Sequence, residues 1–117
     1  MDKKNTLVYL EDVLESANLI SDYLSGVSEQ EFYKDIGVQD KVIRRLEIIG
    51  EAVKQISEEI KSKYPDIPWR KIAGMRDVLI HEYSGVKMRR VWLAVNKDLP
   101  QLRERISKII EGLNPLV

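Results

Sequence analysis

Apolar residues recur every three or four positions along almost the whole chain, and this period constrains the fold more than any other feature. The first such stripe is typical of an amphipathic helix that Gly26 ends. It comprises Leu7, Leu10, Leu14, Ala17, Ile20 and Leu24. No long apolar/polar alternation and no Asn-Gly or Asp-Gly turn competes with the helical period. The chain is therefore predicted to be all-α.

Local signals divide the first half of the chain into helices. The run from Ser28 to Glu31 has the pattern of a capping box, in which the serine and the glutamate bind each other's backbone N–H groups. It should open a short helix that ends near residues 35–37. A long helix is then predicted from Val38 to Lys63. Its inner face would carry Val42, Ile43, Leu46, Ile49, Val53, Ile56 and Ile60.

Prolines mark the boundaries in the second half. The sequence YPDIPW contains two prolines three positions apart, which a helix interior does not accommodate. Pro68 can stand in the first turn of the next helix, which Gly85 would end. A last helix should follow as far as about Gly112, with a kink or break near residues 97–99 because Pro100 lies inside it.

These elements predict one domain over residues 1–117, an up-and-down bundle of about five helices. At 117 residues, with 44% hydrophobic and 32% charged residues, the chain is long enough to bury a core. The N-terminus has no apolar segment typical of a signal peptide, and no apolar run approaches the length that spans a bilayer. We expect a cytoplasmic protein without a membrane partner.

Composition excludes several kinds of site. There is no cysteine and only one histidine, so a thiolate metal site is impossible and a structural zinc site is not expected. The sequence has no glycine-rich phosphate loop and no coenzyme fingerprint. We expect neither a cofactor nor a metal.

The charge distribution is uneven although the formal net charge is zero. Residues 68–90 contain six basic and two acidic residues, a balance of +4, and the other 94 residues carry −4. A basic region could attract a phosphate locally, whereas the neutral whole argues against dedicated DNA recognition. Ordinary unevenness of charge in a helical protein is an equally good interpretation.

The segment RDVLIHEY, residues 76–83, gathers the reactive side chains of the chain around its only histidine. On an ideal helix Arg76 and Tyr83 lie within about 20° of each other, and Asp77 is a neighbour of His81. His81 lies about 140° from Arg76, so one helix does not direct both at one point. Either the helix loosens near His81, or a second chain completes the site.

Two interpretations of this segment stay open. His81 could complement the dipole at a helix C-terminus while Tyr83 packs as an amphipathic aromatic. Alternatively, histidine exchanges protons near neutral pH and arginine binds phosphate through two hydrogen bonds. The second combination suits cleavage of a phosphodiester without a metal ion.

A second group of charged residues precedes it on the predicted long helix. Glu47 and Glu51 lie four positions apart on one face, and could bind Mg²⁺ or form ion pairs with nearby basic side chains. We favour ion pairs, with a supporting role toward Arg76. Gly50 lies mid-helix, where glycine usually permits another helix to approach closely, and Gly74 suggests the same.

Arg76, His81 and Tyr83 form an Arg-x4-His-x-Tyr motif that resembles the motif of HEPN-domain ribonuclease toxins, in particular the HepT branch. The likeness extends over YLEDVLES, QDKVIRRLEIIGEAVKQI, YPDIPWRKIAGMRDVLIHEYSGV and VWLAVNKDLPQL. It implies a homodimer with two copies of the motif in a shared cleft that cuts RNA without metal. Arg76 would then hold the scissile phosphate, His81 would act as general base or acid, and Asp77 would be the polar residue that the family favours after the arginine.

The resemblance also implies regulation within a type II (HEPN/MNT) toxin–antitoxin system. In the HepT branch the motif tyrosine accepts AMP from a nucleotidyltransferase antitoxin of the MntA kind, a role that would fall to Tyr83. The chain has no nucleotidyltransferase motif of its own, so the antitoxin would act in trans. The alternative is a non-catalytic HEPN module that binds a nucleotide or a partner protein.

Overall fold

The computed structural model describes residues 3–81 and 87–113, and every element in these ranges is helical. The elements are α1 (Lys3–Tyr23), α2 (Glu29–Lys34), α3 (Ile36–Gln55), α4 (Glu58–Lys63), α5 (Trp69–His81), α6 (Met88–Leu93), the π-helical segment η2 (Ala94–Asp98) and α7 (Leu99–Leu113). The all-α prediction is confirmed. Because α6, η2 and α7 follow one another without interruption, the described residues form six helices, so the expected number of about five is wrong by one.

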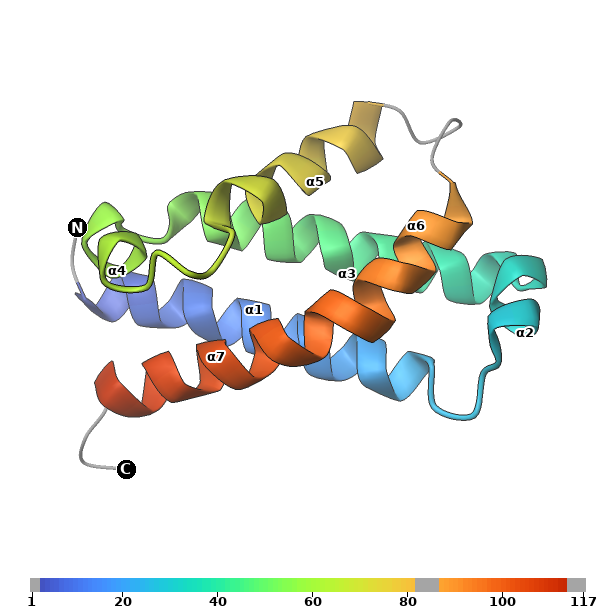
Figure 1. Ribbon diagram of the computed structural model, residues 1–117, viewed down its shortest axis with the longest axis horizontal. Coiled ribbons are helices and arrows are strands. Elements are labelled where there is room, and N and C mark those ends of the chain that lie inside the picture. The colour runs from blue at the N-terminus through green and yellow to red at the C-terminus, as the bar shows by residue number, and fades with distance from the viewer. Residues whose placement is uncertain (1–2, 82–86, 114–117) are drawn as a thin grey trace.

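Helices α1 and α3 form the centre of the bundle and run antiparallel to each other (Figure 1). Helix α7 packs on the other side of α1, and α5 packs across α3. The apolar stripes meet between these helices, where Leu10, Ile49 and Ile106 are fully buried. Each such side chain contributes about 1.5–3 kcal/mol by leaving water. The packing of α5 on α3 matters most here, because it places Arg76 against the polar edge of α3.

One helix boundary was not predicted. It lies inside the helix expected from Val38 to Lys63, which the structure divides into α3 and α4. The chain leaves the helical conformation at Ile56, which has φ −68° and ψ 137°. Ser57 is the N-cap of α4, and its hydroxyl oxygen accepts a hydrogen bond from the backbone N–H of Ile60 at 3.4 Å. Both Ile56 and Ile60 are buried, so the apolar period continues across the break and conceals it.

Other predicted boundaries agree with the structure. The chain turns after α1 at Gly26, whose φ of +75° is the left-handed conformation that favours glycine. The capping box before α2 is present: Glu31 N–H donates to Ser28 Oγ at 3.1 Å, and Ser28 N–H donates to Glu31 Oε1 at 3.2 Å. The cap expected at Gly85 lies outside the described residues.

The irregularity expected before Pro100 is a π-helical turn. In η2 the N–H of Leu99 bonds the carbonyl of Ala94, five residues back. Proline has no N–H to continue the α-helical pattern, and the wider turn stands directly before it. The helix therefore continues into α7 without a break. None of the described helices is long and apolar enough to cross a membrane.

Candidate active site

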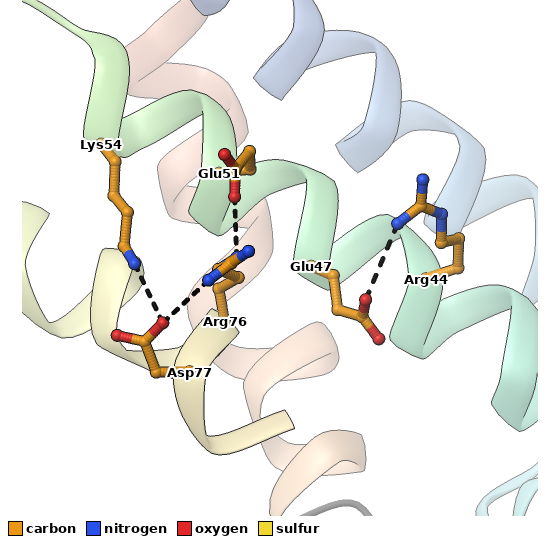
Figure 2. A network of polar contacts seen from close by, with 6 residues as sticks. All are labelled: Arg44, Glu47, Glu51, Lys54, Arg76 and Asp77. Atoms are coloured by element: carbon orange, nitrogen blue, oxygen red, sulfur yellow. Dashed lines mark hydrogen bonds and ion pairs between the residues drawn. The ribbon is translucent and has the colours of Figure 1, made fainter. Parts of the chain in front are cut away.

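Four charged residues line one edge of α3: Arg44, Glu47, Glu51 and Lys54 (Figure 2). Their spacing of three, four and three positions places them on the same side of the helix. Helix α5 crosses near this edge and adds Arg76 and Asp77. The resulting cluster joins the motif segment to a helix that precedes it by more than 20 residues in the sequence.

Gly50 makes this crossing possible. A Cβ atom at Gly50 would lie 2.5 Å from the Cβ of Arg76 and 3.3 Å from its Cα. No side chain fits at such distances, so the backbone of α5 can approach α3 only where α3 has a glycine. The prediction of close packing at Gly50 is confirmed. At Gly74 it is wrong, because a Cβ there would meet nothing within 4 Å.

The guanidinium group of Arg76 is held by two carboxylates. Its Nε forms an ion pair with Glu51 Oε2 at 2.7 Å, and its Nη1 donates to Asp77 Oδ1 at 3.1 Å. The side chain of Arg76 is 30% exposed, so the group is fixed in orientation yet open to solvent on part of its surface. Glu51 thus stands in the position that supports Arg76.

Asp77 joins the two helices. Its Oδ1 accepts a hydrogen bond from Lys54 Nζ at 2.9 Å in addition to the bond from Arg76. The Lys54 bond, followed by the Arg76 bond, lowers the pKa of the Asp77 carboxyl below its usual range. Asp77 is therefore tied to Arg76 as well as to α3, and it stands four positions before His81 in the sequence.

Glu47 behaves differently from Glu51. It faces Arg44 at 3.7 Å rather than Arg76, and its side chain is 21% exposed. The two glutamates thus form ion pairs with basic residues, the interpretation that we favoured over a metal site. Among the side chains that the structure describes, no three carboxylates are arranged to hold a metal ion.

A hollow of about 350 Å³ opens beside Arg76 between α1 and α3. It is lined by Tyr9, Asp12, Arg44, Glu47, Ile48, Glu51, Ala52 and Arg76. Sequence reasoning did not assign Tyr9, Asp12 or Lys54 to the site. The position of Lys54, three residues after Glu51 on the same helix face, could have indicated that it belongs to the site. Tyr9 and Asp12 lie on a separate helix, and only packing brings them close to Arg76.

The remaining motif positions lie at the edge of what the structure describes. His81 is the last residue of α5, and its side chain is outside the described set. Tyr83 also lies outside the described residues. The described part of the site is thus an anchored arginine with donors left for an anion, on the helix that ends at the only histidine.

Comparison with known proteins shows the family of the chain. The family described as Ribonuclease HepT-like matches residues 13–109. A Thermococcus cleftensis protein named "Probable ribonuclease HepT" is 43% identical, over 92% of this chain and 97% of its own. A candidate RNase from Caldanaerobacter subterraneus subsp. tengcongensis is 41% identical, over 88% of this chain and 92% of its own.

A longer relative shares the same region. A Methanocaldococcus jannaschii protein, named as a gamma-glutamylcyclotransferase and candidate RNase, is 46% identical over 96% of this chain, which spans only 50% of that relative. No solved structure matches the chain. The family match covers most of the sequence, including Glu51, Lys54 and the whole motif. The chain belongs to the HepT-like ribonuclease family.

Proposed function

We propose that this protein is a metal-independent endoribonuclease that acts in the cytoplasm as the toxin of a type II (HEPN/MNT) toxin–antitoxin system. Its active site would form at the cleft of a homodimer, where two copies of the motif face each other. The observation that supports this most is the anchoring of Arg76 by Glu51 and Asp77, because it prepares a guanidinium group for a phosphate. Family membership supports RNA as the substrate.

In the proposed reaction the 2′-oxygen of the RNA bonds to phosphorus and gives its proton to a base. The bond from phosphorus to the 5′-oxygen breaks, and that oxygen takes a proton. Arg76 stabilises the charge that develops on the phosphate, and His81 serves one of the two proton transfers. His81 of the second copy can make the other proton transfer, which is why a dimer suits this chemistry.

The test is RNA cleavage by the purified, unmodified protein in excess EDTA. We expect cleavage by the wild type, and a loss of at least about 100-fold in His81→Ala and Arg76→Ala, the scale of a lost general acid–base or charge-stabilising group. Lys108→Ala, in an exposed ion pair on α7, is the matched control and should cleave normally. Equal cleavage by wild type and His81→Ala would reject the assignment.

We further propose that a nucleotidyltransferase of the MntA kind inactivates the toxin by transferring AMP from ATP to the Tyr83 hydroxyl. The tyrosine oxygen would bond to the α-phosphorus, pyrophosphate would leave, and the hydroxyl proton would be lost. A bulky phosphodiester and base beside Arg76 would compete with RNA for the guanidinium group. Co-expression with a nucleotidyltransferase of this kind should raise the intact mass by a multiple of an AMP unit and abolish cleavage. The Tyr83→Phe variant should keep its original mass, and a mass increase in that variant would place the modification elsewhere.

One observation favours a second function, a non-catalytic module that binds a nucleotide or a partner protein. The hollow beside Arg76 contains the carboxylates of Asp12, Glu47 and Glu51 and only two guanidinium groups, a balance that does not favour a long polyanion. This alternative predicts tight binding of a mononucleotide, no RNA cleavage, and no growth defect on expression.

A further inference from the structure

Lys54 reaches from α3 to the motif segment on α5 (Figure 2). Its Nζ lies 2.9 Å from Asp77 Oδ1, the same oxygen that accepts Arg76 Nη1 at 3.1 Å. Two cations thus share one carboxylate oxygen. Lys54 lies 23 positions before Asp77 in the sequence, so this contact exists only when α5 is packed on α3.

The charges around Arg76 show what this contact does. Arg76 touches two carboxylates, those of Glu51 and Asp77, so these three groups together carry a charge of −1. A phosphodiester, itself an anion, would be repelled by such a group. Lys54 brings the sum of the four side chains to zero, which leaves the local field of Arg76 able to attract a phosphate.

The contact also orients Asp77. Both hydrogen bonds fall on Oδ1, which turns this oxygen toward α3 and Arg76. The two contacts therefore hold the carboxylate of Asp77 beside the guanidinium group of Arg76.

We propose that Lys54 is a positioning residue of the ribonuclease site: it holds Asp77 toward Arg76, and it balances the carboxylates that would otherwise cancel the charge of Arg76. This inference rests on the proposed function and extends it to a residue outside the motif.

Solvent exposure separates this role from a structural one. The side chains of Lys54 and Asp77 are 35% and 48% exposed. Ion pairs at such exposure contribute little to the stability of a fold. Loss of Lys54 should therefore affect the site far more than it affects unfolding.

The test compares Lys54→Met, which removes the charge at similar length, with Lys54→Arg, which keeps it. Lys63→Met is the matched control, since Lys63 forms an exposed ion pair with Glu59 on α4. We expect Lys54→Met to lower kcat/KM for RNA by about tenfold or more, the effect of one added unit charge near the site. Lys54→Arg should restore most of the activity, and all three variants should unfold at nearly the wild-type temperature.

The kinetic constants separate the two effects expected of Lys54. A rise in KM reports the charge balance around the phosphate, and a fall in kcat reports the orientation of Asp77 beside Arg76. If the wild type cleaves RNA and Lys54→Met cleaves it equally well, the inference is wrong. A loss in Lys54→Met that Lys54→Arg does not reduce would also overturn it.

A second readout stands without enzyme activity. The described charged groups that bond Asp77 are Lys54 on α3 and Arg76 on α5, and Arg76 also pairs with Glu51 on α3. NMR can follow the Asp77 carboxyl as pH changes, and its pKa should rise in Lys54→Met and stay unchanged in Lys63→Met. If the wild type cleaves no RNA, the proposed function fails, and the titration still tests whether Lys54 holds Asp77: an unchanged pKa in Lys54→Met overturns that contact.

Discussion

At the scale of single residues, the site depends on where the backbone of α5 touches α3. The guanidinium group of Arg76 can lie 2.7 Å from the carboxylate of Glu51 because Gly50 has no side chain at the crossing. The chain contains a second glycine nearby, Gly74, two positions before Arg76 on α5 itself, where there is open space. The two glycines thus form a natural pair for measuring how much the close approach matters.

Replacing each glycine by alanine should have opposite effects on stability. Gly50→Ala forces the helices apart and should cost about 1–3 kcal/mol, as overpacking does. Gly74→Ala adds a helix-favouring residue in open space and should stabilise the protein by up to about 1 kcal/mol. Urea unfolding measures both. RNA cleavage should fall in Gly50→Ala only, and a Gly50→Ala protein as stable as the wild type would contradict the packing argument.

At the scale of elements, α3 is the helix on which the site is built. Its apolar face packs on α1, while its polar edge supplies Glu51 and Lys54 to α5. The segments before and after it, α2 and α4, each have only six residues and depend on their caps. Ser28 caps α2 through a complete capping box, whereas the Ser57 cap of α4 is a single long hydrogen bond of 3.4 Å.

The two caps should differ measurably in strength. Ser28→Ala removes a hydroxyl acceptor that lies 3.1 Å from its donor, and should destabilise the protein by about 1 kcal/mol. Ser57→Ala should cost about 0.5 kcal/mol, at the low end for such substitutions. Thermal unfolding of both variants checks the order, and a larger loss in Ser57→Ala would show that α4 is held mainly by its cap.

At the scale of the whole molecule, the formal net charge is zero, and oppositely charged side chains form small groups of ion pairs on the surface. Besides the cluster around Arg76, Arg105 of α7 binds Asp66 before α5 at 2.8 and 3.0 Å, linking the start of the motif helix to the far side of the bundle. Within the cluster around Arg76, acid affects Asp77, because protonating its carboxylate removes its attraction for Lys54 and Arg76.

Acid should therefore weaken the fold by protonating two carboxylates, those of Asp77 and Glu31. The pKa of Asp77 is lowered by its hydrogen bonds to Lys54 and Arg76, and that of Glu31 by the backbone and side chain of Ser28. A carboxyl with a lower pKa in the folded state contributes stability above its unfolded pKa of about 4, and loses that contribution as pH falls through the folded value. Glu31→Gln should thus be less stable than the wild type near pH 7, and Asp77→Asn only slightly so, because the ion pairs of Asp77 are exposed to solvent.

The difference should shrink as pH falls below about 4. Urea midpoints measured from pH 7 to pH 3 for the wild type and both variants test this. A gap that stays constant over the whole range would mean that the carboxylates contribute by packing rather than by charge.

Much of the fold followed from patterns that act over a few residues. The helical period identified the buried face of α3, and capping residues and prolines marked most boundaries. The break at Ile56–Ser57 was missed because the apolar period runs through it: Ile56 and Ile60 are both buried, so the pattern predicts one continuous helix. The same limit applies to glycine: Gly50 and Gly74 are alike in sequence and differ only in what crosses them.

The sequence by itself determined the helical class, the buried faces and the motif residues, because each depends on spacing along one helix or on the identity of a side chain. The tertiary structure decided which carboxylate reaches Arg76, and that Lys54 reaches Asp77 from 23 positions away. These pairings depend on the angle and register at which α5 crosses α3. That crossing is the outcome of packing two helix surfaces against each other, which no spacing within either helix contains.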